Sequence, residues 1–110
     1  MKSERQNKNR DMLVLVMHLG KNFPDIEDLE KSGDLFLLAS DLSYSLFEAT
    51  ELGYTELLKR LKRLNPNVVV TTEVEDERYV SQSGDTVYVL GGKVADEREF
   101  IRRWLGKDCW

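Results

Sequence analysis

The change of pattern at Pro66 is the feature that most constrains the fold of this chain. The preceding segment, TELLKRLKRL, places Leu57, Leu61 and Leu64 on one face of an α-helix. The next residues, VVVTTEV, are rich in β-branched side chains, and proline does not continue a helix. The chain therefore combines helices with strands, and we expect an α+β fold.

The segments before this helix carry apolar residues at helical spacing. Arg10 to Leu19 fits an amphipathic helix, although its β-branched residues leave a strand open. Pro24, the acidic residues that follow it, and Gly33 predict a short helix between them. The apolar residues from Leu35 to Ala49 fit one helix or two. We therefore expect several helices before the first strand.

After the proline, the sequence favours a small antiparallel meander and a last helix. Three runs of strand formers, VVVTTEV, RYVSQ and DTVYVLGG, are separated by acidic or turn-forming residues. Asp96 and Glu99 have the spacing of a capping box, and the helix that they open is expected to end at Gly106. We expect a single domain over residues 1–110, with residues 1–9 as a basic flexible arm.

Charge is distributed unevenly in a chain that is acidic as a whole. The 110 residues have a net charge of −4, and their 41% hydrophobic content suits one soluble core. Residues 54–70 hold four Lys or Arg and one Glu, whereas Asp25 to Glu30 and Glu73 to Glu77 are acidic. The sequence has no apolar run of membrane-spanning length, and Cys109 has no second cysteine with which to pair. These features predict a cytoplasmic protein without a membrane segment.

The sequence does not contain the residue patterns of common catalytic or metal-binding sites. His18 is its single histidine, and we expect it to be packed and hydrogen-bonded rather than a ligand or a base. The serines lack a Gly-x-Ser-x-Gly context, and the acidic residues lack the spacing of a calcium loop. We therefore expect no metal, no cofactor and no enzymatic activity.

Residues from Ser45 to Gly91 resemble the winged helix-turn-helix transcriptional regulators of the broad MarR and ArsR type. The matching parts are a short helix, SLFEATEL, a turn at Gly53 and Tyr54, the basic helix TELLKRLKRL, and a hairpin, TTEVEDERYVSQSGDTVYVL, in the place of the wing. The resemblance implies a winged helix-turn-helix domain. In it, N-terminal helices precede a small antiparallel hairpin or meander and a C-terminal helix.

The same resemblance implies a homodimeric transcriptional regulator that binds double-stranded DNA. The basic side chains of the central helix lie mostly opposite its leucines, where they can meet phosphates and base edges in a major groove. The expected DNA contacts are Tyr54, Lys59, Arg60, Lys62, Arg63 and Arg78. The expected dimer interface consists of Phe100, Ile101, Trp104 and Leu105.

Other interpretations of these features stay open. Lys and Arg are also typical of a solvated helix face, and the last helix can dock on the core of its own domain. The alternative function is a non-enzymatic protein-interaction module, or a viral or mobile-element inhibitor, whose acidic surface meets a basic partner. That surface is expected at Asp25 to Glu30 and Glu73 to Glu77.

Overall fold

The computed structural model describes residues 10–20 and 22–109, with side chains described as far as residue 103. This part of the chain forms seven strands and three helices. They are β1 (Met12–Met17), α2 (Glu27–Ser32), β2 (Leu35–Ser40), β3 (Tyr44–Ala49), α3 (Glu51–Leu64), β4 (Val69–Thr71), β5 (Glu77–Val80), β6 (Thr86–Leu90), β7 (Lys93–Ala95) and α4 (Glu97–Cys109).

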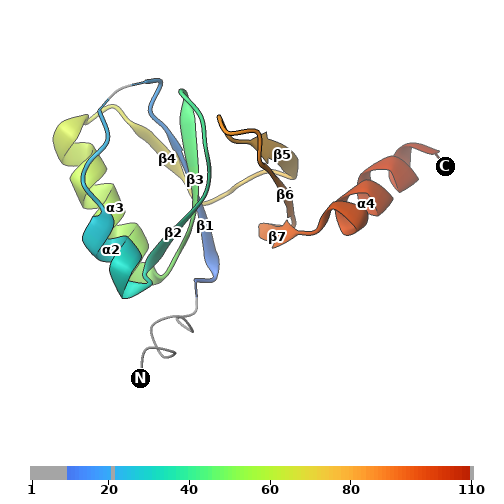
Figure 1. Ribbon diagram of the computed structural model, residues 1–110, viewed down its shortest axis with the longest axis horizontal. Coiled ribbons are helices and arrows are strands. Elements are labelled where there is room, and N and C mark those ends of the chain that lie inside the picture. The colour runs from blue at the N-terminus through green and yellow to red at the C-terminus, as the bar shows by residue number, and fades with distance from the viewer. Residues whose placement is uncertain (1–9, 21, 110) are drawn as a thin grey trace.

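The first six elements build one layered unit. Its four strands lie in the order β2-β3-β1-β4, and every neighbouring pair is antiparallel. With α2 between β1 and β2 and α3 between β3 and β4, this is the split βαβ arrangement of ferredoxin-like domains. Both helices lie on the same face of the sheet (Figure 1). The arrangement positions the surfaces described below but does not itself specify a function.

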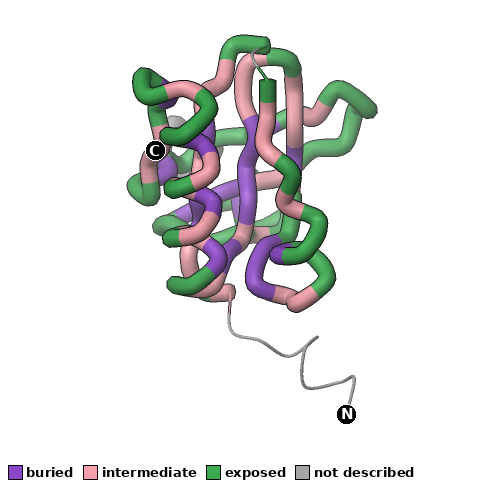
Figure 2. The backbone as a smooth tube through the Cα atoms, turned by 90° about the vertical axis from the view of Figure 1, so that its left-hand side faces the viewer, coloured by how far each residue is buried: buried purple, intermediate pink, exposed green. Residues whose placement is uncertain are grey.

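The main core lies between this sheet and the two helices. Figure 2 shows buried backbone running through the middle of the layered unit. Each apolar side chain that is fully buried here stabilises the fold by about 1.5–3 kcal/mol. The buried members are Val14, Val16, Leu29, Leu35, Phe47, Ala49, Leu57, Leu61 and Val68.

The opposite face of the sheet is covered in part by a three-stranded antiparallel meander, β5-β6-β7. The Tyr44 hydroxyl, from β3, donates a hydrogen bond to the Val80 carbonyl on β5 and so ties the two sheets together. The buried residues between them are Leu13, Ala39, Leu46, Val74, Tyr79 and Val89. The first sheet is therefore covered by helices on one face and by strands on the other.

The start of α3 is anchored to the junction between α2 and β2. Thr50 caps the helix by accepting a hydrogen bond from the Gly53 amide at 3.0 Å, and its own amide donates to the Asp34 carbonyl at 2.9 Å. A Cβ atom on Gly53 would lie 2.1 Å from that carbonyl oxygen. Glycine is therefore needed at this position for close packing of two backbones.

The structure shows that the predicted winged helix-turn-helix fold is wrong. Strands β1, β2 and β3 occupy residues 12–49, where N-terminal helices were expected, apart from the short helix α2. Helix α3 begins at Glu51 and runs through Gly53, where a turn was expected. The sequence of these strands was interpreted as helical because both faces of the first sheet are covered. Their apolar residues therefore do not alternate with polar ones.

The predicted meander and last helix are partly correct. The VVVTTEV segment joins the first sheet as β4, and the third strand of the meander is β7, which was not predicted. The short helix before Gly33 is confirmed, with Gly33 in the left-handed conformation at its end. The Asp96 cap is also confirmed, because its carboxylate accepts a 2.8 Å hydrogen bond from the Glu99 amide. Helix α4 continues to Cys109 and does not end at Gly106.

Candidate functional site

The basic face of α3 is less available than its composition predicts. Lys59 is exposed, but its ammonium group lies 3.6 Å from the Glu56 carboxylate. Lys62 donates to the Val68 carbonyl at 3.1 Å, next to the start of β4. Tyr54 is half-buried and packs against the main core. Arg63 is exposed and forms no ion pair with any residue that the structure describes.

Arg60 joins α3 to α2. Its guanidinium donates two hydrogen bonds to the Asp28 carboxylate, at 2.8 and 2.9 Å, and lies 3.6 Å from Glu56. A further hydrogen bond of 3.1 Å reaches the Asp25 carbonyl. The hydrogen bonds from Arg60 lower the pKa of Asp28 to about 2. Arg60 is therefore bound within the fold, and a phosphate group would have to compete with Asp28 for it.

The six residues expected to contact DNA do not lie on one surface. Five belong to α3, on the helical face of the first sheet. Arg78 is an exposed residue of β5, which belongs to the sheet that covers the opposite face. The hairpin that was expected to form a wing beside the basic helix is therefore separated from it by the first sheet.

The residues expected at a dimer interface also have different environments. Phe100 is 5% exposed and packs against Tyr88 of β6, with their ring centroids 5.0 Å apart. It belongs to the fold of its own chain. Ile101 is 43% exposed. The side chains of Trp104 and Leu105 lie outside the described residues.

His18 and Ser45 form a contact that superficially resembles a base and a nucleophile. His18 Nε2 lies 2.9 Å from Ser45 Oγ, and the imidazole ring packs edge-on against Phe23. Ser45 is 5% exposed, so its hydroxyl is not accessible to a substrate. The contact links the end of β1 to β3 and is consistent with the packed, hydrogen-bonded role predicted for His18.

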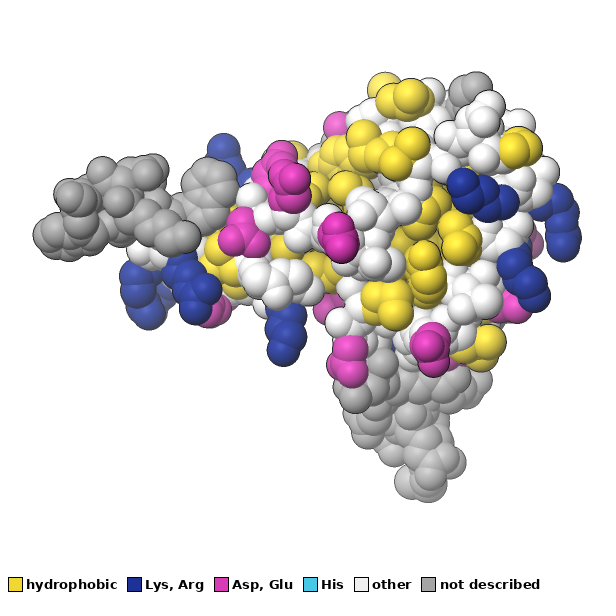
Figure 3. All heavy atoms as spheres, turned by 180° about the vertical axis from the view of Figure 1, so that it is seen from behind, with side chains coloured by type: hydrophobic (Ala, Val, Ile, Leu, Met, Phe, Trp, Pro, Cys, Tyr) yellow, Lys and Arg dark blue, Asp and Glu magenta, His cyan; other side chains and the backbone are white. Residues whose placement is uncertain are grey.

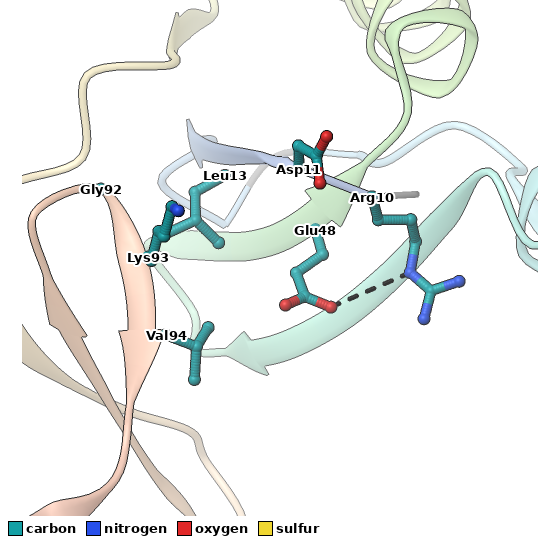
Figure 4. A pocket seen from close by; sticks show the side chains of 7 residues that line it. All are labelled: Arg10, Asp11, Leu13, Glu48, Gly92, Lys93 and Val94. Atoms are coloured by element: carbon teal, nitrogen blue, oxygen red, sulfur yellow. Dashed lines mark ion pairs between the residues drawn. The ribbon is translucent and has the colours of Figure 1, made fainter. Parts of the chain in front are cut away.

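An open pocket of about 470 Å³ lies between the first sheet and the turn that joins β6 to β7 (Figure 4). Arg10 and Glu48 form an ion pair across 3.8 Å at one side of it, and the Arg10 guanidinium also lies over the Phe36 ring. The lining residues are Arg10, Asp11, Leu13, Glu48, Gly92, Lys93 and Val94. Two bases are thus balanced by two acids, and this pocket does not favour a ligand of either charge.

A second open groove, of about 450 Å³, has a consistent chemical character, and we call it the acidic groove. It lies on the meander side of the first sheet, beside β1 and β4. Apolar and aromatic side chains line it together with three carboxylates and one guanidinium at the edge. The lining residues are Leu15, Met17, Tyr44, Thr71, Glu73, Glu75, Glu77, Arg78 and Tyr79.

The three carboxylates of the acidic groove follow one another at every second residue. The intervening Val74 is buried in the core between the sheets. Asp76 turns to the β6–β7 side, where its carboxylate accepts a 2.8 Å hydrogen bond from the Gly91 amide. Glu73 and Glu75 line the groove from the irregular segment between β4 and β5, and Glu77 lines it from the first position of β5. We call these three residues the carboxylate row.

The acidic groove has an excess of negative charge, with three glutamates and one arginine among its lining residues. No ion pair neutralises Glu73, Glu75 or Glu77 within the described part of the chain. Burial raises the pKa of the Tyr79 hydroxyl above its ordinary value, and the charges of Glu77 and Glu75 add to the rise. Burial is also the first cause of the raised pKa of Tyr44. A cation is therefore favoured at this site and an anion is disfavoured.

The other acidic segment expected at a partner surface lies elsewhere. Asp25 to Glu30 leads into and forms α2, on the helical face of the first sheet. Asp28 is bound to Arg60, and Glu27 lies 3.3 Å from Lys31. The two acidic segments therefore do not form one surface, and only the carboxylate row borders a groove with an apolar lining.

The surface of the molecule shows where the apolar side chains are exposed. Figure 3 shows hydrophobic side chains gathered across one side of the molecule, with separate acidic side chains among and around them. Most of the Lys and Arg side chains in this view lie toward its two ends. The sequence EVEDE, residues 73–77, contains the three glutamates of the carboxylate row together with the buried Val74. The apolar lining was missed because β1 and β3 were expected to be helical.

Comparison with protein-family models, with curated proteins and with solved structures found no match to this chain. Among the residues that the structure describes, no helix has the length and apolar content needed to cross a membrane. In the same residues, no group of three or more His, Cys, Asp or Glu side chains is placed to hold a metal ion. The acidic groove is therefore the candidate functional site.

Proposed function

We propose that this protein is a non-enzymatic interaction module that binds a cationic, partly apolar segment of a partner protein in the acidic groove. The carboxylate row carries this proposal, because it places three negative charges, none of them in an ion pair with a described residue, beside an apolar lining. Lys and Arg have long apolar stems and charged ends, so one such side chain can cover Leu15 or Met17 while its charge meets a glutamate.

The two parts of the groove contribute to binding in different ways. Apolar surface removed from water favours binding by about 25 cal/mol per Å², so the lining contributes to affinity independently of charge. Exposed ion pairs contribute only about 0.2–1 kcal/mol each, and salt screens them. The carboxylate row therefore mainly selects a basic partner and accelerates its association.

DNA binding through α3 is the other candidate function and stays a prediction. Lys59 and Arg63 are the exposed cations that would carry it, since Arg60 is bound by Asp28 and Lys62 by backbone carbonyls. Binding of duplex DNA at about 50 mM salt, where electrostatic attraction is strong, would support this function. Such binding should then be lost in the Lys59→Ala, Arg63→Ala variant.

A fluorescence anisotropy titration tests the protein-interaction proposal. The probe is a short labelled peptide of Lys, Leu and Ala, and its counterpart with Glu in place of Lys serves as the negative control. We expect the basic peptide to bind and the acidic peptide not to bind. Removing two charges of the row, in Glu73→Gln with Glu75→Gln, should weaken binding about fivefold, from about 0.5 kcal/mol per exposed pair.

A matched variant controls for the loss of overall negative charge. Glu27→Gln with Glu30→Gln removes the same charge from α2, on the other face of the first sheet. It should leave the affinity for the basic peptide within about twofold of the wild-type value, because screening limits its reach to roughly 8 Å in physiological salt. Equal weakening by the two variants would show that the peptide responds to net charge and would refute a specific groove.

A further inference from the structure

Helix α4 of the same chain carries a cationic surface that complements the acidic groove. Its residues Arg98, Arg102 and Arg103 are exposed. None of them forms an ion pair with a residue that the structure describes. Among the residues that the structure describes, the chain therefore displays three arginines of α4 and three glutamates of the acidic groove without an ion pair.

The attachment of α4 determines which of its sides is available. Phe100 is buried against β6, and the Tyr88 hydroxyl lies 3.4 Å from the Glu97 carboxylate, so the first turn of the helix is fixed to the meander. Residues of an α-helix follow one another at about 100°, which places Arg98 and Arg102 each roughly 160° around the helix from Phe100. Both arginines therefore face away from the body of their own chain, and we call them the guanidinium row.

The guanidinium row and the carboxylate row have similar spacing. Positions four apart in a helix are separated by about 6.0 Å along its axis. Glutamates two positions apart in the chain are separated by at most about 7 Å. Two successive glutamates of the groove are therefore close enough together to face Arg98 and Arg102 at the same time.

We propose that the acidic groove of one copy of this chain binds α4 of a second copy through these two rows. The inference rests on the proposed function of the groove and names its partner. Helix α4 leads away from the rest of its own chain (Figure 1), so it presents its guanidinium row to another molecule. Reciprocal binding of two chains gives a closed dimer with two identical contacts, whereas one-way binding gives longer assemblies.

Sedimentation velocity of the full chain at about 100 µM protein and about 50 mM salt tests the proposal. The wild type should self-associate and should dissociate as salt is raised. Arg98→Glu with Arg102→Glu, and separately Glu73→Lys with Glu75→Lys, should each weaken self-association by about tenfold or more, because attraction becomes repulsion. Lys59→Glu with Arg63→Glu makes the same charge change on α3 and should have little effect.

Mixing the two reversed variants gives the decisive result. The reversed groove of one meets the reversed helix of the other, and the two unchanged surfaces also match. We therefore expect the equimolar mixture to associate as strongly as the wild type.

Circular dichroism shows whether each variant is folded. If the reversed helix variant unfolds, Arg98→Gln with Arg102→Gln is used in its place. If the reversed groove variant unfolds, Glu73→Gln with Glu75→Gln is used in its place. Each should weaken self-association about fivefold for every contact between two chains.

Three results would overturn the inference: a monomeric wild type, unaltered association of the reversed helix variant, or a mixture that stays monomeric although both variants are folded. A monomeric wild type that still binds the basic peptide through the carboxylate row would refute α4 as the partner and leave the proposed function standing. Failure of the peptide to bind would count against the proposed function itself.

Discussion

Gly53→Ala is expected to destabilise the protein, although alanine is the better helix former by about 1 kcal/mol. Gly53 lies in the first turn of α3, and an added Cβ would come within 2.1 Å of the Asp34 carbonyl oxygen and 2.8 Å of its carbon. Both atoms belong to the backbone, so either α3 or the start of β2 has to move. A separation of 3.0 Å, the shortest that such contacts normally reach, requires a shift of 0.9 Å.

The magnitude follows from the groups that this shift disturbs. Overpacking of a tight contact costs typically about 1–3 kcal/mol. The shift also strains two hydrogen bonds, each worth about 1 kcal/mol. One runs from the Thr50 amide to the Asp34 carbonyl, and the other, of 2.8 Å, runs from the Thr50 hydroxyl to the Asp34 carboxylate. After the gain in helix propensity is subtracted, we expect a net loss of about 2–4 kcal/mol in the free energy of unfolding.

Urea unfolding followed by circular dichroism measures this change. Thr55→Ala, at an exposed position of the same helix, serves as the control and should change stability by less than about 0.5 kcal/mol. A Gly53→Ala variant that is as stable as the wild type, or more stable, would show that the two backbones are not in close contact. The account of how α3 is anchored would then be wrong.

Three further perturbations test other parts of the structure. Arg60 lowers the pKa of Asp28 to about 2 from 3.8, so their interaction stabilises the fold above about pH 4 and is lost as pH falls toward 2. An NMR titration of Arg60→Gln should find that the pKa of the Asp28 carboxyl is higher than in the wild type. Tyr44→Phe removes a hydrogen bond between the two sheets and should lower the free energy of unfolding by about 1 kcal/mol in urea. Leu57→Ala empties a fully buried position and should cost about 2–5 kcal/mol by the same assay, whereas Leu64→Ala, at a side chain that is 52% exposed, should cost less than about 1 kcal/mol.

The sequence predicted best those elements whose signals are local. Asp96 caps α4 by accepting a hydrogen bond from the amide of Glu99, three residues later. Gly33 ends α2 in the left-handed conformation that glycine favours. The leucine face of α3 was also identified correctly at Leu57 and Leu61, which are both buried. Capping and amphipathic periodicity depend on a few neighbouring residues, so tertiary contacts did not override them.

The strands before Pro66 were missed because their pattern depends on what covers them. Val14 and Val16 face the helices, whereas Leu13 and Leu15 face the meander, so β1 is apolar at successive positions. Alternation disappears in a strand that is covered on both faces. Gly53 was misread as a turn because close approach of a distant backbone, at Asp34, leaves no signal in the local sequence.

The candidate site was predictable only in part. The acids of Glu73 to Glu77 were identified as a possible partner surface, and their clustering is visible in the sequence. Their apolar neighbours in the groove come from β1, β3 and β4, and only the sheet topology brings these segments together. Conversely, Arg60 was assigned to DNA because its partner Asp28 lies in another helix, 32 positions away.

The separation of the two sheets along the chain has a consequence for synthesis on the ribosome. All four strands and both helices of the layered unit lie before Thr72, and the meander that covers its second face follows. Leu13 and Leu46 on that face are not fully covered until Val74, Tyr79 and Val89 have all left the exit tunnel. A nascent chain at this stage exposes apolar surface of the kind that chaperones bind. Chains truncated shortly after Thr71 and released from the ribosome should therefore aggregate more readily than the full-length protein.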